Sequence, residues 1–272
     1  MRTILRFLKR IWFLNFVRRL YTASKYYNKK YIQIIKWGFT SREDTNYTYD
    51  IKDENKNYLA QTISVVTGKD FNEVYGYLKE ILEDDSLVAH VQECIKNSKQ
   101  GKFADKNVKF GRRIGWYAFV RALKPKIVVE TGVDKGLGSV ILCSALNKNK
   151  QEGFEGYYYG TDINPEAGYI FSGEYTQFGE ILYGDSIESL SNLNKSIDIF
   201  INDSDHSADY EYQEYQTITP LLNQNSIILG DNSHKFDPLS RYSIENNRKF
   251  LFFKEKPLNH WYPGGGIGIS YL

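Results

Sequence analysis

The fold of this chain is decided by the stretch Val128-Val-Glu130-Thr-Gly132-Val-Asp-Lys-Gly136-Leu-Gly138-Ser139. Its first residues belong to a short apolar run that begins at Ile127, and an apolar helical pattern follows Ser139. Glycines between a strand and a helix let the backbone turn sharply and approach a ligand, and the first turn of the helix offers free N–H donors. The glycine order is GxxxGxG, whereas dinucleotide-binding loops carry GxGxxG. The stretch therefore favours a nucleotide-like ligand without indicating a dinucleotide.

Short apolar runs continue beyond this stretch and alternate with helical patterns. The seven runs are Ile127–Glu130, Tyr157–Ile163, Glu180–Tyr183, Ile197–Asn202, Ser226–Leu229, Lys249–Phe253 and Ile267–Tyr271. The first five are separated by connections long enough for crossovers, which predicts parallel strands flanked by helices. The last two are joined by a Pro/Gly-rich segment, which predicts an antiparallel pair at the edge of the sheet. The predicted fold class is therefore α/β, with a seven-stranded, mostly parallel sheet and an antiparallel edge hairpin.

A helical region is expected ahead of this sheet. Apolar spacing predicts helices over Asn57–Thr67, Asp70–Glu83, Ser86–Asn97 and Phe110–Leu123. Asp70 and Ser86 are the expected N-caps, Ser41–Asn57 reads as a loop, and Gln100–Asn107 reads as a linker. The chain is thus predicted to divide into an N-terminal arm over residues 1–40, a helical region over residues 41–107 and a ligand-binding domain over residues 108–272.

The N-terminal arm is both basic and apolar. Residues 1–42 hold eleven Lys or Arg and no Asp or Glu, whereas the rest of the chain holds 24 basic and 33 acidic residues. Apolar residues near one helical face are Leu5, Leu8, Trp12, Phe16 and Leu20. Such a helix lies peripherally on an anionic membrane, or it packs on the body or on a second subunit, which is the commoner fate of Trp and Phe at helical spacing. A secretory signal is disfavoured because charges interrupt the apolar run, and the arm is too apolar for a nucleic-acid surface.

The composition excludes several classes of protein. The chain is 42% hydrophobic and 25% charged, which is ordinary for a globular protein and excludes a wholly disordered one. No apolar stretch reaches the roughly 18 residues that span a bilayer. Cys94 and Cys143 lie too far apart in the sequence for a CxxC motif, which excludes a thiolate zinc cluster and a disulfide scaffold. Their small number suits a reducing compartment, so a cytoplasmic location is expected.

Carboxylates follow the predicted strands at successive positions. In chain order the strand ends carry Glu130, Asp162, Asp185, Asp203 with Asp205, and Asp231. Ligands of open α/β sheets bind beyond the carboxyl ends of the strands, where these residues are expected to meet. One acid alone is commonly a helix cap, but five successive ends predict a ligand site. All-oxygen groups of this kind suit a hard cation such as Mg²⁺.

Residues 110–272 resemble a class I S-adenosylmethionine-dependent methyltransferase. The stretch over residues 128–138 resembles the first motif of that family. The stretch Asp198-Ile-Phe-Ile-Asn202-Asp203-Ser-Asp205-His206 is similar to the DxxxxDxDH segment of sugar and macrolide O-methyltransferases. Asp231-Asn232 is similar to the acidic pair at the next strand end in those enzymes. The resemblance implies a Rossmann-like fold that binds S-adenosyl-L-methionine and acts on a sugar-like small molecule, and it leads us to expect a homo-oligomer.

The resemblance also implies a role for individual residues. The residues expected to contact the cofactor are Glu130, Gly132, Gly136, Gly138, Asp162, Asp185, Ser186 and Asp203, with Asp162 on the ribose. Asp203, Asp231 and Asn232 are the implied Mg²⁺ ligands. His206 is the implied general base, and His234 is the second candidate. The sequence departs from the family at two positions, where Asn202 replaces an apolar residue and Asn232 replaces an acid.

The expected chemistry is methyl transfer to a hydroxyl. The cofactor's methyl group is already activated, so the enzyme must position the acceptor and remove its proton. A bound cation and a neutral histidine both assist that deprotonation. Two alternatives are a non-catalytic scaffold that uses the basic arm to sit on a membrane or complex, and a dehydrogenase. The collected strand-end acids argue against the scaffold, and the glycine order argues against the dehydrogenase.

Overall fold

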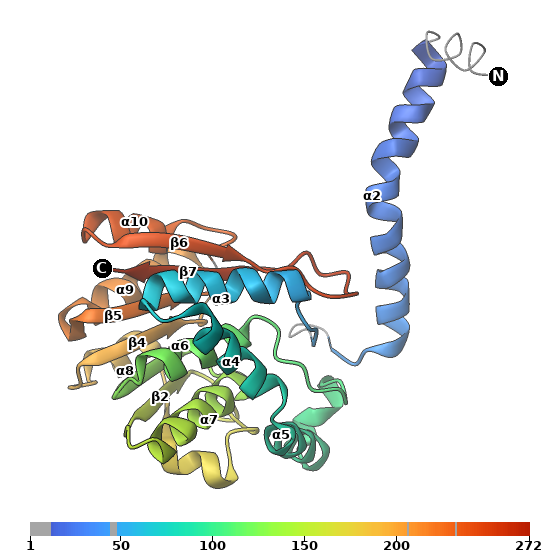
Figure 1. Cartoon of the computed structure of the whole chain (residues 1–272). Coiled ribbons are helices and arrows are strands. Elements are labelled where there is room, and N and C mark those ends of the chain that lie inside the picture. The colour runs from blue at the N-terminus through green and yellow to red at the C-terminus, as the bar shows by residue number, and fades with distance from the viewer. Residues whose placement is uncertain (1–11, 44–47, 206, 232) are drawn as a thin grey trace.

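The computed structural model describes residues 12–43, 48–205, 207–231 and 233–272, apart from the side chains of residues 13–15. Figure 1 shows a central sheet between helices, with one long helix projecting from the body. The strands are β1 (Ile127–Thr131), β2 (Tyr157–Asp162), β3 (Gly179–Tyr183), β4 (Ile197–Asn202), β5 (Leu222–Gly230), β6 (Lys249–Lys254) and β7 (Gly266–Tyr271). Their order is β3-β2-β1-β4-β5-β7-β6. The first five pair in parallel, and β7 runs antiparallel to β5 and β6, which confirms the predicted fold class and edge hairpin.

Helices cover both faces of this sheet. One face carries α3 (Asp53–Thr67), α4 (Phe71–Leu82), α5 (Asp85–Asn97), α6 (Arg113–Leu123) and α7 (Leu137–Gln151). The other carries α8 (Ser186–Ser191), α9 (Ala208–Ile218) and α10 (Pro238–Glu245). Short 3-10 helices are η1 (Lys99–Phe103), η2 (Gly173–Phe178) and η3 (Thr219–Leu221), and the projecting helix is α2 (Trp12–Thr40). Across the described residues, no helix combines the length and the hydropathy that crossing a membrane requires.

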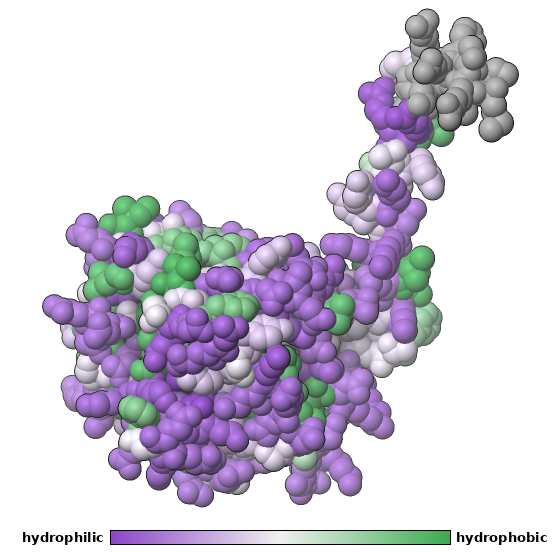
Figure 2. Space-filling view, in the orientation of Figure 1, coloured by the Kyte–Doolittle hydropathy of each residue, from purple (hydrophilic) through white to green (hydrophobic). Residues whose placement is uncertain are grey.

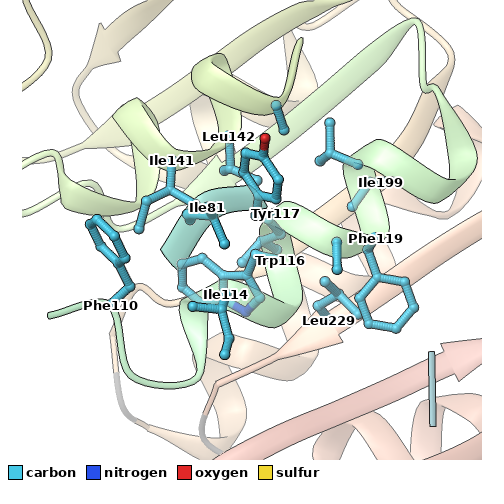
Figure 3. Packing of buried hydrophobic residues seen from close by; sticks show 14 of the residues in the cluster. Ile81, Phe110, Ile114, Trp116, Tyr117, Phe119, Ile141, Leu142, Ile199 and Leu229 are labelled. Carbon is cyan, nitrogen blue, oxygen red and sulfur yellow. The ribbon is translucent and has the colours of Figure 1, made fainter. Parts of the chain in front are cut away.

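The larger buried cluster joins the helical region to the sheet. Leu59 of α3 and Ile81 of α4 belong to the same cluster as Trp116 of α6 and Ile199 of β4. Figure 3 shows side chains of α6 lying among those of α4, α7 and the sheet. The opposite face has its own cluster, which includes Leu190, Phe200, Tyr215, Ile218 and Tyr242. The helices ahead of residue 107 therefore share a core with the sheet, while the predicted three-part division of the chain stays a prediction.

The start of α3 differs from the predicted one because a tertiary contact decides it. The helix begins at Asp53, inside the stretch predicted as a loop. Asn55 is buried there, donating to the carbonyl oxygen of Lys254 at 3.0 Å and accepting from the amide of Lys256 at 2.7 Å. These partners lie at the far end of the chain, where hydrophobic spacing gives no sign of them. The predicted linker is also partly helical, since η1 occupies Lys99–Phe103.

Aspartate side chains cap the first turns of α4 and α5. Asp70 caps α4 as predicted, since its carboxylate accepts from the amide of Asn72 at 2.8 Å. The prediction of Ser86 as the cap of α5 is wrong, because Asp84 accepts from the amide of Leu87 and the helix begins at Asp85. Two acids precede Ser86 in the sequence, and a carboxylate is as good a cap as a hydroxyl.

The carboxyl ends of the parallel strands are aligned at one edge of the sheet. Thr131 of β1 is the register partner of Thr161 on one side and of Asn202 on the other. Asn202 is in turn the partner of Gly230 at the end of β5. The residues that follow these four strands consequently meet at the same edge.

We predict that Leu59→Ala lowers the free energy of unfolding by about 2–5 kcal/mol, because Leu59 is fully buried between α3 and the sheet core. Val65→Ala on the same helix is the matched control, since Val65 is 65% exposed and its loss is expected to change stability by no more than about 0.5 kcal/mol. Urea denaturation of both variants measures the difference. Equal, small effects would show that α3 does not share the core of the sheet.

Candidate functional site

A cavity of about 590 Å³ lies at the carboxyl edge of the sheet. The ends of β1 to β4 and the loops after them line one side, including Gly132, Asp162, Asp185 and Asp203. The helical region lines the other side through α5, residues 104–109 and Arg113. A cavity of this size is typical of a small-molecule or cofactor site.

The glycine loop between β1 and α7 approaches its neighbours too closely for side chains. Gly132 has φ +83, and a Cβ there would lie 2.0 Å from the carbonyl oxygen of Asp203. Gly136 has φ +90 and is the residue before α7. A Cβ on Gly138 would lie 2.0 Å from the side-chain oxygen of Glu130. The three glycines thus bring the loop and the start of α7 against β1 and the loop after β4, and all three line the cavity.

Glu130 is a buried carboxyl group beneath this loop. It is 1% exposed and accepts hydrogen bonds from the hydroxyls of Tyr158 and Ser139. Burial raises the pKa of Glu130 to about 7, although both hydrogen bonds act to lower it. Glu130 also lines the cavity, where it was predicted to contact the cofactor. Its carboxyl group is fixed by the hydroxyls of Tyr158 and Ser139.

Asp162 and Asp185 both reach the cavity, as the strand-end argument predicts. Asp162 uses its two oxygens to accept from the amides of Asp134 and Asn164, each at 2.8 Å, which fixes its carboxylate at the end of β2. Asp185 caps α8 by accepting from the amide of Glu188 at 3.0 Å. Carboxylate oxygens accept more than one hydrogen bond each, so a capping or loop role leaves capacity for a ligand.

Ser186 and Asn202 are held by one buried carboxyl group, that of Glu214 on α9. Ser186 and Asn202 both donate to Glu214, together with Thr131 at 3.1 Å and Ser204 at 2.9 Å. Burial raises the pKa of Glu214 to about 7, while these donors act to lower it. Asn202, one of the two departures noted in the sequence, thus ties the end of β4 to α9. Ser186 borders the cavity, but its hydroxyl is already used in the hydrogen bond to Glu214.

Two carboxyl groups predicted as metal ligands lie together and face two arginines. Arg112 forms an ion pair with Asp231 and a second one with Glu255 at 3.2 Å, and all three side chains are buried. Arg113 lies 3.5 Å from Asp203. Tyr49 adds a hydroxyl that donates to Glu255 at 2.9 Å. Both arginines stand at the start of α6, so two cations meet the carboxyl groups at the ends of β4 and β5.

Asp203 and Asp231 have opposite pKa shifts and share a hydrogen bond. Burial and the neighbouring charge of Asp231 raise the pKa of Asp203 well above its usual value. Burial also acts to raise the pKa of Asp231, but the adjacent Arg112 holds it below its usual value. We infer that Asp203 carries the shared proton and donates to an ionised Asp231.

This arrangement is a poor fit for Mg²⁺. The ion prefers ionised oxygen ligands that are free to surround it. Asp231 already pairs with Arg112, and Asp203 lies 3.5 Å from Arg113, so two cations already stand beside the two carboxyl groups. Within the described parts of the chain, no group of three His, Cys, Asp or Glu side chains is placed to hold a metal ion. Asn232, the third predicted ligand, lies outside the described residues.

Of the two predicted histidines, the structure describes only His234. His206, the predicted general base, lies outside the described residues, although its neighbour Asp205 lines the cavity. His234 is half-buried, and its Nδ1 lies 3.2 Å from the carbonyl oxygen of Asp231. It is not among the residues that line the cavity. Burial lowers the pKa of His234, which favours its neutral form.

Four residues of this network were not predicted from the sequence: the two cations Arg112 and Arg113, and their neighbours Glu255 and Tyr49. One signal for them exists. Arg112 and Arg113 stand at the N-terminus of a largely apolar helix, where the helix dipole disfavours cations. Two arginines at such a position are expected to pair with acidic residues, but the sequence does not identify those residues.

Comparison with known proteins gives a family match and several similar folds. Residues 129–233 match a family model described as a methyltransferase domain. The O-methyltransferase TomG from Streptomyces achromogenes, solved with S-adenosylmethionine and involved in tomaymycin synthesis, has a TM-score of 0.51 and 12% identity, over 70% of this chain and 91% of that one. The S-adenosylhomocysteine-bound methyltransferase PaMTH1 from Podospora anserina has a TM-score of 0.49 and 16% identity, over 69% and 87%. No curated protein sequence matches the chain significantly. At these identities the structural likeness shows the fold.

We predict that Glu130→Gln changes how stability depends on pH. The pKa of Glu130 is raised to about 7 in the folded protein. Its contribution to the free energy of unfolding is therefore fully present below about pH 4.5 and is lost as the pH rises through 7. Between pH 5 and pH 8 the wild type should therefore lose about 2–3 kcal/mol of unfolding free energy relative to the variant. Urea denaturation across this range measures the divergence. Glu174→Gln, at an exposed carboxylate, should show none, and a parallel response of wild type and Glu130→Gln would contradict the assignment.

Proposed function

We propose that the protein is an S-adenosylmethionine-dependent methyltransferase that transfers a methyl group to a hydroxyl of a small polar acceptor such as a sugar. The match of residues 129–233 to a methyltransferase domain supports this proposal. The observation that carries the proposal is the cavity itself. It brings the glycine loop after β1 together with the carboxylates that end β2 and β3. A similar fold, that of TomG, holds S-adenosylmethionine.

We assign the sheet side of the cavity to the cofactor. Asp162 is fixed at the end of β2 by two amides and accepts the ribose hydroxyls in the proposed complex. Asp185 at the end of β3 accepts from the exocyclic amine of adenine. The loop over residues 132–136 lets the ligand approach the backbone, because Gly132 and Gly136 carry no side chain there. When bound, the cofactor supplies a sulfonium methyl group that is already activated for transfer.

We assign the helical side of the cavity to the acceptor. Its lining includes polar side chains from elements ahead of the sheet, among them Thr48, Asp105, Lys109 and Arg113. Because these side chains include both hydrogen-bond donors and hydrogen-bond acceptors, they suit a methyl acceptor that carries several hydroxyls. Val91 and Ile95 of α5 supply the apolar part of this wall, which excludes water from the site.

The reaction also needs a group that takes the acceptor's proton. A neutral histidine suits that role at physiological pH, since its unperturbed pKa is near 6.5. We propose His206, which directly follows Asp205 of the cavity wall, and keep His234 as the second candidate. No step is assigned to Mg²⁺, because the described carboxyl groups at its expected place are already balanced by Arg112 and Arg113.

Calorimetric titration with S-adenosylhomocysteine tests the proposal without knowledge of the acceptor. The wild type should bind, and Asp162→Asn should weaken binding by at least about tenfold, because a charge-assisted hydrogen bond to the ribose is worth about 1.5–3 kcal/mol. Asp209→Asn is the matched control, since this exposed carboxylate on α9 does not line the cavity.

Two results would contradict the proposal. A wild type that does not bind S-adenosylhomocysteine would favour the non-catalytic scaffold considered from the sequence. Binding that Asp162→Asn leaves unchanged would move the cofactor away from the assigned wall. Thermal melting of each variant separates a lost ligand contact from a lost fold.

A further inference from the structure

The helix α2 stands away from the rest of the molecule. It runs over the 29 residues from Trp12 to Thr40 and is about 43 Å long at 1.5 Å per residue. Figure 1 shows it projecting from the body along almost its whole length. All its described side chains are exposed except Ser24, Gln33 and Trp37, which are half-buried. Tertiary packing, which normally holds such a helix in place, is therefore confined to one end.

That end is fixed to the body by aromatic and polar contacts. The ring of Trp37 lies 5.2 Å from that of Trp261 and 6.4 Å from that of His260. Directly after the helix, the hydroxyl of Ser41 donates to Asp105 at 2.9 Å, and the amide of Arg42 donates to the same carboxylate at 2.8 Å. Asp105 lines the cavity, so the base of α2 is joined to the wall of the site.

One face of α2 is apolar, and the opposite face carries basic side chains together with the exposed Tyr21 and Ile32. At 100° per residue, Phe16, Leu20, Tyr27, Tyr31 and Ile34 follow one another on one face, and all of them are exposed. Arg18, Lys25, Lys29 and Lys36 follow one another on the opposite face in steps of four or seven residues. The helix contains no Asp or Glu. In Figure 2 the projecting helix accordingly carries both green and purple surface.

We propose that α2 lies on an anionic membrane surface and holds the body there. The apolar face enters the boundary of the acyl chains, while the lysines and arginines on the other side reach the acidic headgroups. Long basic side chains extend around an apolar face in this way because their stems are apolar and only their tips are charged. Tyr27 and Tyr31 on the apolar face supply rings with a polar tip, which suits the same boundary.

Charge decides between a membrane and a second copy of this helix. Two copies that paired through their apolar faces would join two helices that carry only positive charge, and neither helix offers an acidic partner for the basic face. An anionic bilayer satisfies the apolar face and the basic face at once. The attachment goes beyond the proposed reaction and does not depend on it.

Sedimentation of the full-length protein with vesicles tests this proposal. Vesicles of phosphatidylcholine mixed with phosphatidylglycerol should bind the protein at least about tenfold more tightly than vesicles of phosphatidylcholine alone, and added salt should weaken that preference. The triple variant Lys25→Gln, Lys29→Gln, Lys36→Gln should lose about a hundredfold in affinity for the anionic vesicles. Replacing Leu20 and Ile34 by serine should weaken binding to both kinds of vesicle, because it removes exposed apolar side chains from the inserting face.

Matched controls separate the helix from general charge effects. Lys96, Lys195 and Lys249 are exposed on the body, and their replacement by Gln removes the same charge. This control should bind anionic vesicles as the wild type does. Thermal melting of each variant reports whether the body is still folded.

Three outcomes would overturn the proposal. Equal binding of the wild type to neutral and anionic vesicles would remove the role of the basic face. Equal loss in the body-lysine control would show that α2 is not the attachment. If the wild type does not bind vesicles, and the Leu20→Ser, Ile34→Ser variant is a monomer in sedimentation velocity where the wild type is a dimer, then the helix covers a second copy of the chain.

Discussion

A buried ion pair between Arg112 and Asp231 joins the parts of the molecule that form the site. Arg112 belongs to the start of α6, Asp231 follows β5, and Glu255 follows β6. Leaving any one of these charges buried without its partner would cost about 3–5 kcal/mol, so the three segments are held in one arrangement. Tyr49, which precedes α3, joins the same network through Glu255.

A second buried carboxyl group organises the opposite side of the strand ends. Glu214 collects hydrogen bonds from the ends of β1 and β4 and from the start of α8. The loop after β4, which carries Asp203 and Asp205 into the cavity, is thus held from below by Ser204 and from the side by Arg113. Preorganised groups of this kind need not rearrange when a ligand enters, which is what the proposed transfer requires.

Much of this arrangement can be predicted from the sequence, because parallel strands place their carboxyl ends together. Asp162, Asp185 and Asp203 were expected at one site and all line the cavity. Their partners were not predictable, since periodicity identifies the helix that contains Arg112 but not the residues that oppose it across the fold. Ser186 was expected to contact the cofactor; it lines the cavity, and its hydroxyl donates to Glu214. The spacing of residues 1–40 predicted an amphipathic helix, and within its described part the body covers only the C-terminal end.

Guanidinium groups lie where the resemblance to metal-dependent methyltransferases implies a bound cation. A crystal structure of the protein grown with S-adenosylhomocysteine and Mn²⁺, examined by anomalous scattering, tests it directly. We expect the nucleoside to lie in the cavity with its ribose bound to Asp162. We also expect Arg112 to stay paired with Asp231, with no manganese peak between Asp203 and Asp231. A manganese peak that bridges these two carboxylates, with Arg112 displaced, would contradict this expectation.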